Sequence, residues 1–304
     1  SWALRGPPMD DVRSLGAFFD LWELYGDATL AGTLAGTLLA VLGVHVVLQR
    51  QVFLAAAVSQ TAGLGATVAF FAAAHLGAAG AFASPTVMSL VTTLAAVLLV
   101  TTGPASRSPH RETWLGVVFV AGAAGVQVLG ATIPNDKADI DAAIFGSPIA
   151  VLPDDLAALV WMAGGLLVLH AWWWRGFGAI TFDPVGARVR GLPVGLLRAA
   201  LWVGLAVAVA TCTRILGALP TFAFVVLPAF AAIRLAPNLA WALLAAGLMG
   251  AASGFGGYLL AYLADLSVNA GHALAAMGVA ASAELLRLLL SSLFSPRREP
   301  HVAR

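Results

Sequence analysis

Polar side chains that could bind a ligand are few in this chain, and most lie within long apolar stretches. The densest group is Ser59, Gln60 and Thr61, three consecutive residues with hydrogen-bonding side chains. Polar groups in such surroundings usually face the protein interior or a water-filled cavity. We therefore predict that all three line a path through the apolar part of the protein, with Gln60 as the leading site residue. A hydrogen bond between helices accounts for Gln60 equally well.

Imidazole and amide side chains form a second, scattered set. His45 and His170 are isolated within their own apolar stretches. A lone histidine there is more often a packed, hydrogen-bonded residue than a metal ligand, so both are weak candidate ligands only. Gln127 is predicted to line the path or to bridge helices. His75 and His272 lie at the predicted outer ends of helices, where we expect them to be solvated.

Enzyme chemistry finds no support in the sequence. Glu284 is the one acid well inside an apolar stretch, and Arg287 follows it three residues later, so we expect an ion pair within one helix. The chain has no Gly-x4-Gly-Lys-Ser/Thr, Gly-x-Ser-x-Gly or His-Glu-x-x-His pattern. Its one cysteine, Cys212, excludes an intrachain disulfide. We therefore predict no catalytic residues and no cofactor bound by this chain.

Composition indicates the elements that must carry these residues. Sixty per cent of the residues are apolar and only 10% are charged, against about a quarter charged in soluble domains. The mean hydropathy is +0.91. These values predict an all-α polytopic membrane protein, and a net charge of +1 gives no indication of nucleic-acid binding.

A helix that crosses a bilayer needs about 20 apolar residues. Nine stretches qualify, with eight as the alternative if those flanking Arg214 merge. We expect residues 1–27 to be an extracytoplasmic segment with an interfacial helix at 17–25, residues 28–295 to be one transmembrane domain, and residues 296–304 to be a basic tail. The predicted spans are 28–48, 52–75, 83–103, 114–133, 155–174, 195–213, 219–235, 239–263 and 271–294.

Two further features concern helix packing. Gly32-x-x-x-Gly36 and Gly250-x-x-x-Gly254 are spaced so that helix backbones can approach closely in lipid. Pro228 lies inside the span 219–235, where it removes a backbone hydrogen bond and is predicted to kink the helix. Kinked helices often flank a path, so Pro228 joins the predicted pathway residues.

The distribution of charge predicts the orientation. Placing Arg50 inside puts 12 of the 16 Lys and Arg residues on the cytoplasmic side and 11 of the 15 acids outside. Because cytoplasmic loops carry an excess of Lys and Arg, the N-terminus is predicted to be extracytoplasmic and the C-terminus cytoplasmic.

The segment 180–194 is the most distinctive polar interval, and its residues predict a very short cytoplasmic helix at 183–190. An N-cap, a proline at the first position, basic residues in the last turn, a C-terminal glycine and a stopping proline follow one another. A two-turn helix is marginal alone, so it should dock on another surface. The residues concerned are Asp183, Pro184, Arg188, Arg190, Gly191 and Pro193.

Four stretches carry a family resemblance. They are I-T-F-D-P-V-G-A-R-V-R-G-L-P-V (180–194), A-L-P-T-F-A-F-V-V-L-P-A-F-A-A-I-R-L (218–235), V-V-L-Q-R-Q-V-F-L (46–54) and A-I-F-G-S-P-I-A-V (143–151). Over about 28–295 the chain resembles the membrane subunits of bacterial zinc, manganese and iron ABC importers. The resemblance implies a homodimeric permease of the bacterial cytoplasmic membrane that moves a divalent metal ion by alternating access. It also implies an extracytoplasmic binding protein and cytosolic ATPase subunits, which carry ATP and Mg and bind the 183–190 helix.

One departure from the family concerns the cargo. The second span of these importers usually carries an Asp and, one turn later, a His, which can hold a cation together. Here the corresponding positions are Ala56 and Gln60. Three alternatives therefore stay open: a related permease with a changed cargo or an ATP-driven role other than transport, a scaffold subunit, and a stand-alone secondary carrier. A carrier predicts acids deep in the spans and inverted repeats, of which only Glu284 is found.

Overall fold

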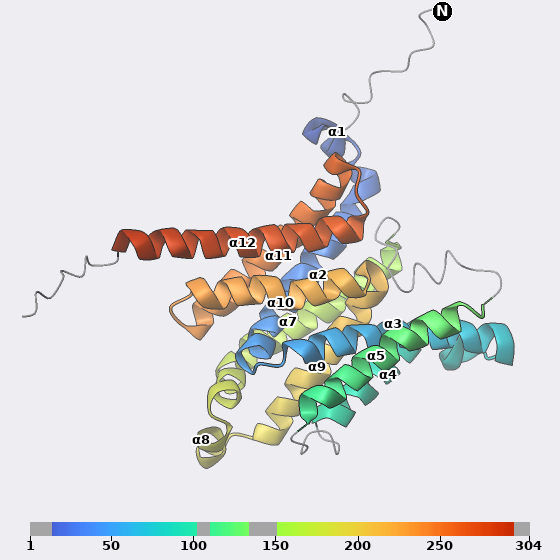
Figure 1. Ribbon diagram of the computed structural model, residues 1–304, viewed down its shortest axis with the longest axis horizontal. Helices are drawn as coiled ribbons and strands as arrows, with labels where there is room; N and C mark the ends of the chain where they lie inside the picture. Colours follow the sequence, from blue (N-terminus) through green and yellow to red (C-terminus); the bar gives the residue numbers. More distant parts are fainter. Residues whose placement is uncertain (1–13, 102–109, 134–150, 295–304) are drawn as a thin grey trace, which may run out of the picture.

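The chain folds into long helices that cross one another at steep angles (Figure 1). The computed structural model describes residues 14–101, 110–133 and 151–294, and over these ranges it contains helices and turns but no strand. This confirms the predicted all-α polytopic class. The predictions on residues 1–13, on most of 143–151 and on the tail 296–304 lie outside the described residues.

Twelve helical elements follow one another along the described chain. They are α1 (Leu15–Asp20), α2 (Trp22–Leu48), α3 (Val52–Leu76), the 3-10 turn η2 (Gly80–Ala83), α4 (Pro85–Thr101), α5 (Arg111–Gly130), α7 (Pro153–Phe182), α8 (Pro184–Val189), α9 (Val194–Leu216), α10 (Ala218–Leu235), α11 (Leu239–Ala264) and α12 (Val268–Phe294).

Eight of the described helices are long and apolar enough to cross a membrane. Each of the nine predicted spans corresponds to a helix, and the difference in number comes from α4, which is apolar but only 17 residues long. The suggested merger around Arg214 is wrong, because α9 and α10 are separate helices. Gly217 divides them with a φ of 91°, a backbone conformation that favours glycine.

The predicted interfacial helix at 17–25 is also wrong in its bounds. Residues 15–20 form α1, whereas Trp22 already begins the membrane helix α2. The reason is aromatic packing, since the buried ring of Phe18 stacks on Tyr25 of α2 and meets Tyr262 of α11 edge-on. With these contacts, α2 begins at Trp22 and not at the predicted residue 28.

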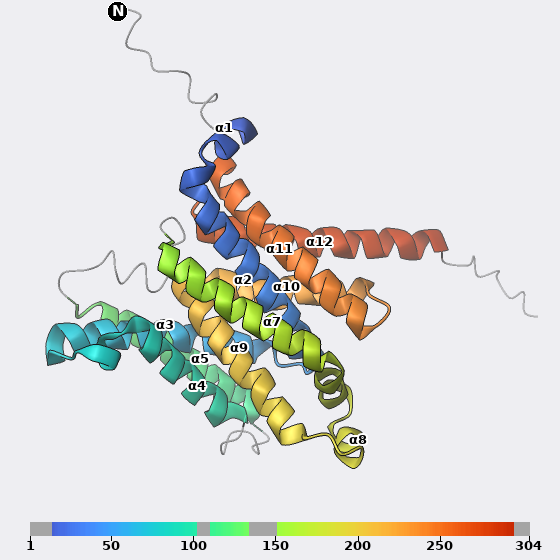
Figure 2. The ribbon, with the colours of Figure 1, turned by 180° about the vertical axis from the view of Figure 1, so that it is seen from behind.

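Glycines bring α2 and α11 into backbone contact. A methyl group at Gly36 would collide with the carbonyl of Gly250, and one at Gly254 would collide with the carbonyl of Gly32. The two predicted small-residue motifs therefore pack on each other, as their spacing allows. α2 also packs against α7, α9 and α10, so it is the central helix of the bundle (Figure 2).

His272 is buried, and the expectation that it is solvated is wrong. Its ring lies against Gly32 and Gly257, where side chains larger than hydrogen would exclude it. Its Nε2 lies 3.1 Å from the carbonyl oxygen of Gly254. His75, in contrast, is exposed at the end of α3, as expected.

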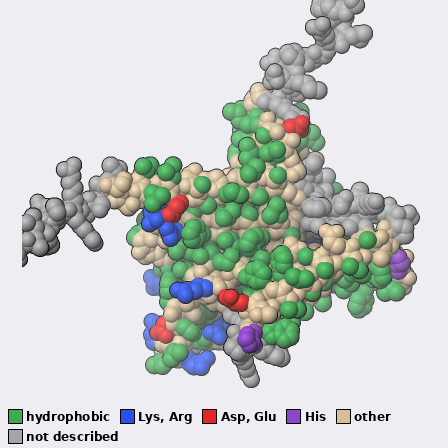
Figure 3. Space-filling view, in the orientation of Figure 1, with side chains coloured by type: hydrophobic (Ala, Val, Ile, Leu, Met, Phe, Trp, Pro, Cys, Tyr) green, Lys and Arg blue, Asp and Glu red, His purple; other side chains and the backbone are tan. Residues whose placement is uncertain are grey.

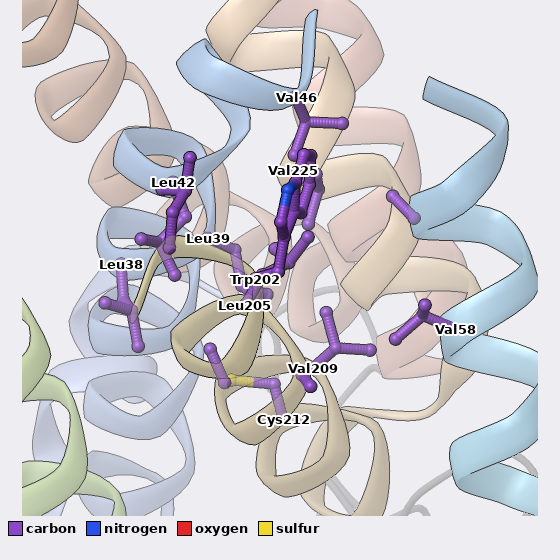
Figure 4. Packing of buried hydrophobic residues seen from close by; sticks show 14 of the residues in the cluster. Leu38, Leu39, Leu42, Val46, Val58, Trp202, Leu205, Val209, Cys212 and Val225 are labelled. Atoms are coloured by element: carbon purple, nitrogen blue, oxygen red, sulfur yellow. The ribbon is translucent and has the colours of Figure 1, made fainter. Parts of the chain in front are cut away.

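The main apolar core surrounds α9. Figure 4 shows side chains from α9 gathered with others from α2, α3 and α10. Trp202, Leu205 and the Cys212 thiol are all buried there. Pro228 is buried inside α10. Near it Gly43 of α2 lies directly against the Val225 carbonyl, so α10 also approaches α2 through a glycine.

We predict that Gly254→Ala destabilises the protein whereas Gly256→Ala does not. The first methyl group would meet the backbone of α2, and overpacking of this kind costs about 1–3 kcal/mol. The second would meet nothing within 4 Å and should add up to about 1 kcal/mol of helix propensity. Thermal unfolding in lipid nanodiscs, followed by tryptophan fluorescence, measures both. Equal losses would contradict the proposed backbone contact.

Candidate functional site

The short helix α8 exists and is capped at both ends by the predicted residues. Asp183 accepts a hydrogen bond from the backbone N–H of Gly186 at 2.8 Å, and Pro184 occupies the first turn. A Cβ at Gly186 would collide with that carboxylate, so a larger residue there would displace the capping side chain. Gly191 has a φ of 78°, as its C-terminal position predicted.

The C-terminal end of α8 is closed by two reverse hydrogen bonds. The N–H of Gly191 donates to the carbonyl of Arg188, and the N–H of Leu192 donates to that of Ala187, both at 3.0 Å. This is the Schellman pattern, which satisfies carbonyls that a helix end leaves unpaired. Arg190 adds a side-chain bond from its Nε–H to the Gly186 carbonyl. Pro193 then occupies the N-cap position of α9, without a capping bond from its side chain.

α8 is fixed to the bundle on one side and open on the other. Ala187 is fully buried in the main core, and α8 packs against α7 and α9. Val185 and Val189 share the opposite face at i,i+4 spacing and are 73% and 83% exposed. Phe182, at the end of α7, is 65% exposed beside them. α8 lies at one tip of the molecule (Figure 2), and these three exposed side chains form what we call the apolar knob.

Basic side chains gather around this tip. In Figure 3 the Lys and Arg side chains lie mainly at the lower left, on the side of α8, and the face above them is largely hydrophobic. Arg188 of α8 and Arg190, which directly follows α8, are both exposed. Exposed arginines therefore lie beside the apolar knob, together with the exposed capping carboxylate of Asp183.

The predicted pathway cluster lies on α3, where two of its three members are already satisfied. The Ser59 hydroxyl donates to the Ala55 carbonyl and the Thr61 hydroxyl to the Val58 carbonyl, both at 2.9 Å and both buried. Gln60 is half-buried, and its backbone lies directly under Gly122 of α5. Gln60 is thus the member of the cluster whose side chain does not bond its own helix, and its role in the path stays a prediction.

The other predicted ligand positions do not join Gln60. Ala56 is buried on the same helix face and offers only a methyl group. Gln127 lies exposed on α5. The pathway role of Gln127 stays a prediction.

His45 and His170 are not isolated, and that expectation is wrong. Their Nε2 atoms lie 3.1 Å apart in the buried contact between α2 and α7. The Nδ1 atom of His45 lies 2.8 Å from the Thr181 hydroxyl, which also accepts from the Gln49 amide at 3.3 Å. Sequence alone could not pair two residues 125 positions apart.

This histidine pair is better explained as a hydrogen-bonded contact than as a metal site. Within the described ranges no group of three or more His, Cys, Asp or Glu side chains comes together. A zinc ion in a protein takes four ligands, at least three of them from side chains. Two imidazoles and a threonine hydroxyl that is already bonded do not meet that need.

Glu284 forms the predicted ion pair with Arg287, and it has a second partner that the sequence did not reveal. Arg287 reaches the carboxylate at 2.6 Å, and Arg234 of α10 reaches it at 2.9 Å. The acid therefore joins the C-terminal end of α10 to α12. Asp155 and Arg214 form another missed ion pair, between α7 and α9. All of these side chains are partly exposed, so each pair adds modestly to stability.

Comparison with known proteins identifies the family. Residues 22–286 match the sequence model described as the ABC 3 transport family. The chain belongs to the ABC 3 transport family. It is therefore a multi-pass membrane permease subunit of the metal-type ABC importers, as the resemblance implied, and not itself an enzyme.

Relatives and a solved structure agree with this assignment. The manganese transport system membrane protein MntD of Bacillus subtilis is 28% identical over 273 residues, which cover 85% of this chain and 88% of that one. The manganese transport system membrane protein MntC of Halalkalibacterium halodurans is 24% identical, with 94% of each chain covered. The structure of PsaBC from Streptococcus pneumoniae in complex with Fab matches with a TM-score of 0.79 at 18% identity. It covers 92% of this chain and 99% of that one, and shows a shared fold.

We predict that Asp183→Ala frays α8 and that Asp183→Asn does not. Loss of an N-cap costs about 1 kcal/mol, whereas asparagine caps as well as aspartate. Hydrogen exchange of the amides at 184–190 in the full chain should therefore rise about fivefold in the alanine variant. Equal exchange in the two variants would show that the side-chain cap does not hold the helix.

Proposed function

We propose that this permease moves a divalent metal ion across the bacterial cytoplasmic membrane, driven by ATP hydrolysis in a partner. In this proposal α8 is the coupling helix that the ATPase subunit grips. The observation that carries the proposal is the apolar knob of Phe182, Val185 and Val189, which is exposed on a capped helix at the basic end of the described part of the molecule. The Lys and Arg bias predicts that this end is cytoplasmic.

The exposed apolar face of α8 suits a docking helix better than it suits a solvated loop. A solvated loop would gain nothing from two apolar side chains on its outer face, whereas burial in a groove would yield about 1.5–3 kcal/mol for each. α8 also connects α7 directly to α9. A displacement of α8 by a partner would therefore act on two membrane helices at once.

The same proposal includes the other components of an importer. A second copy of the permease completes the path, and an extracytoplasmic binding protein delivers the cargo. ATP and Mg bind to the cytosolic ATPase subunits. Membership of the ABC 3 transport family and the fold shared with PsaBC support this assembly.

A divalent metal ion is the leading cargo, because two relatives are named as manganese transport proteins. A specific observation also favours a second candidate, a permease with another cargo or with an ATP-driven role other than transport. Ala56 supplies no ligand, and Gln60 supplies one neutral carbonyl in place of an imidazole. A neutral carbonyl is a poor ligand for zinc.

We predict that Val185→Asp combined with Val189→Asp abolishes co-purification of the ATPase with the permease. Each change puts a carboxylate where the partner would bury an apolar group, and the expected loss of affinity is at least about tenfold. Val185→Ile keeps the surface apolar and should retain binding. A second disruptive variant, Asp183→Lys with Gly191→Val, removes both caps and should also fail to bind. Unchanged assembly in both disruptive variants would refute docking through α8.

We predict that proteoliposomes containing the permease and its ATPase take up Mn²⁺ or Zn²⁺ when supplied with ATP and the binding protein. Gln60→Leu keeps the size of the side chain and removes its ligand atom, so uptake should fall while the thermal midpoint stays the same. Gln127→Leu tests the second predicted pathway amide in the same way. Absence of ATP-dependent uptake of manganese, zinc or iron in the unmodified protein would reject the metal cargo and favour the second candidate.

A further inference from the structure

Helix α7 is interrupted close to the point where it leads into α8. Trp173 has φ −108° and ψ 17°, which are not helical values, so α7 consists of two helical pieces that meet there. The second piece, 174–182, ends at the cap of α8. Gly176 and Gly178 lie within it and weaken its helical preference. A break of this kind is where a helix can absorb a change of angle.

His45 of α2 contacts α7 on both sides of this break. Its Nε2 atom lies 3.1 Å from Nε2 of His170, which precedes Trp173. Its Nδ1 atom lies 2.8 Å from the hydroxyl of Thr181, which follows Trp173. One imidazole ring therefore holds both pieces of α7 against the central helix of the bundle.

The protons of this contact can be assigned from its partners. The Thr181 hydroxyl has one proton, which it donates to the Phe177 carbonyl at 2.7 Å. Thr181 must then accept from His45, which places the His45 proton on Nδ1. Nε2 of neutral His45 is left with a lone pair, and His170 donates to it. Each donor and acceptor in the chain from His170 to Phe177 is thus assigned, which makes the arrangement specific in geometry.

One side of α7 near the break borders open space. An apolar groove of about 720 Å³, open to the outside, lies between α7 and α11 and is also lined by α2. The Phe177 ring, on the second piece, stacks on His170 of the first at 5.0 Å. The residues that line the groove include Val41, Leu167, His170, Trp174, Leu244 and Gly247. α7 is thus held near its break by polar bonds to α2 and by the burial of Phe177 and Ile180 in the main core, and it is bordered by a groove on the side of α11.

We propose that His45 is a latch across the hinge of α7 that makes the 174–182 segment move together with α2. This inference rests on the proposed function, because α8 would be the point at which an ATPase applies force. With the latch closed, a displacement of α8 is transmitted through Thr181 to His45 and so to the central helix. With the Thr181 bond removed, the same displacement bends α7 at Trp173 and does not reach α2. His45 is a positioning residue in this scheme and touches no cargo.

The test uses the full permease assembled with its ATPase and binding protein in lipid nanodiscs and in proteoliposomes. Thr181→Val removes the hydroxyl that accepts from His45 and from the Gln49 amide after the hinge, and His170→Phe removes the bond before it. Thr181→Ser retains the hydroxyl and serves as the rescue variant. Thr67→Val is the control, because the Thr67 hydroxyl also bonds a carbonyl four residues back in its own helix, and Thr67 is more deeply buried than Thr181.

We expect Thr181→Val to retain the ATPase and its hydrolysis but to transport at least about fivefold less cargo per ATP, because one lost hydrogen bond has about that effect and this change removes the bonds from both His45 and Gln49. Amide exchange at 174–182 should rise by about the same factor. His170→Phe should raise exchange before the break instead. Thr181→Ser and Thr67→Val should match the unmodified protein in both measurements.

The outcomes separate the latch from the proposed function. If the unmodified permease fails to bind the ATPase, the proposed function is refuted, and the exchange pattern alone decides whether His45 restrains both pieces of α7. If the ATPase binds but Thr181→Val leaves exchange and transport per ATP unchanged, the latch is refuted and docking stands. Equal effects of Thr181→Val and Thr67→Val would also refute it, because a general loss of threonine packing would then explain the result.

Discussion

The contact between α2 and α11 is the constraint on which the rest of the structure depends. Lipid offers no hydrophobic force to bring helices together, so association relies on close packing and on hydrogen bonds. Gly32, Gly36, Gly250 and Gly254 let two backbones touch, and larger side chains at these positions would push them apart. With α11 fixed on one side, α2 becomes the frame against which α7, α9 and α10 are placed.

Polar residues lie where this frame meets its neighbours. At one end of α2 the His272 ring fills the space left by glycines and bonds the Gly254 carbonyl. At the other end His45 bonds two positions of α7. Both are fully buried, and a buried polar group is costly unless it is bonded. Such residues therefore specify which helix surfaces meet, a task that a uniformly apolar surface cannot perform.

Local features were predictable from the sequence, and distant pairings were not. Hydropathy gave each span, and the caps of α8 followed from Asp183, Pro184 and Gly191, because caps depend on residues within one turn. The partners of His45 and the link from Glu284 to Arg234 join residues 50 or more positions apart. Nothing in the local sequence of an apolar helix encodes such a partner. The small-residue motifs were the one long-range signal that could be read, because their spacing itself describes a packing surface.

The candidate path on α3 and the docking helix α8 differ in how many of the features expected for their proposed roles they carry. Around α8 every feature expected of a docking helix is present, from caps to exposed apolar face. Along α3 the hydroxyls of Ser59 and Thr61 are used by their own helix, which leaves the Gln60 amide as the uncommitted donor and acceptor. A single neutral amide can hold a cation only weakly, so in the proposed importer selection of the cargo would fall to the binding protein. The membrane part would then need little more than a path that opens and closes, and the energy for that motion would enter through α8.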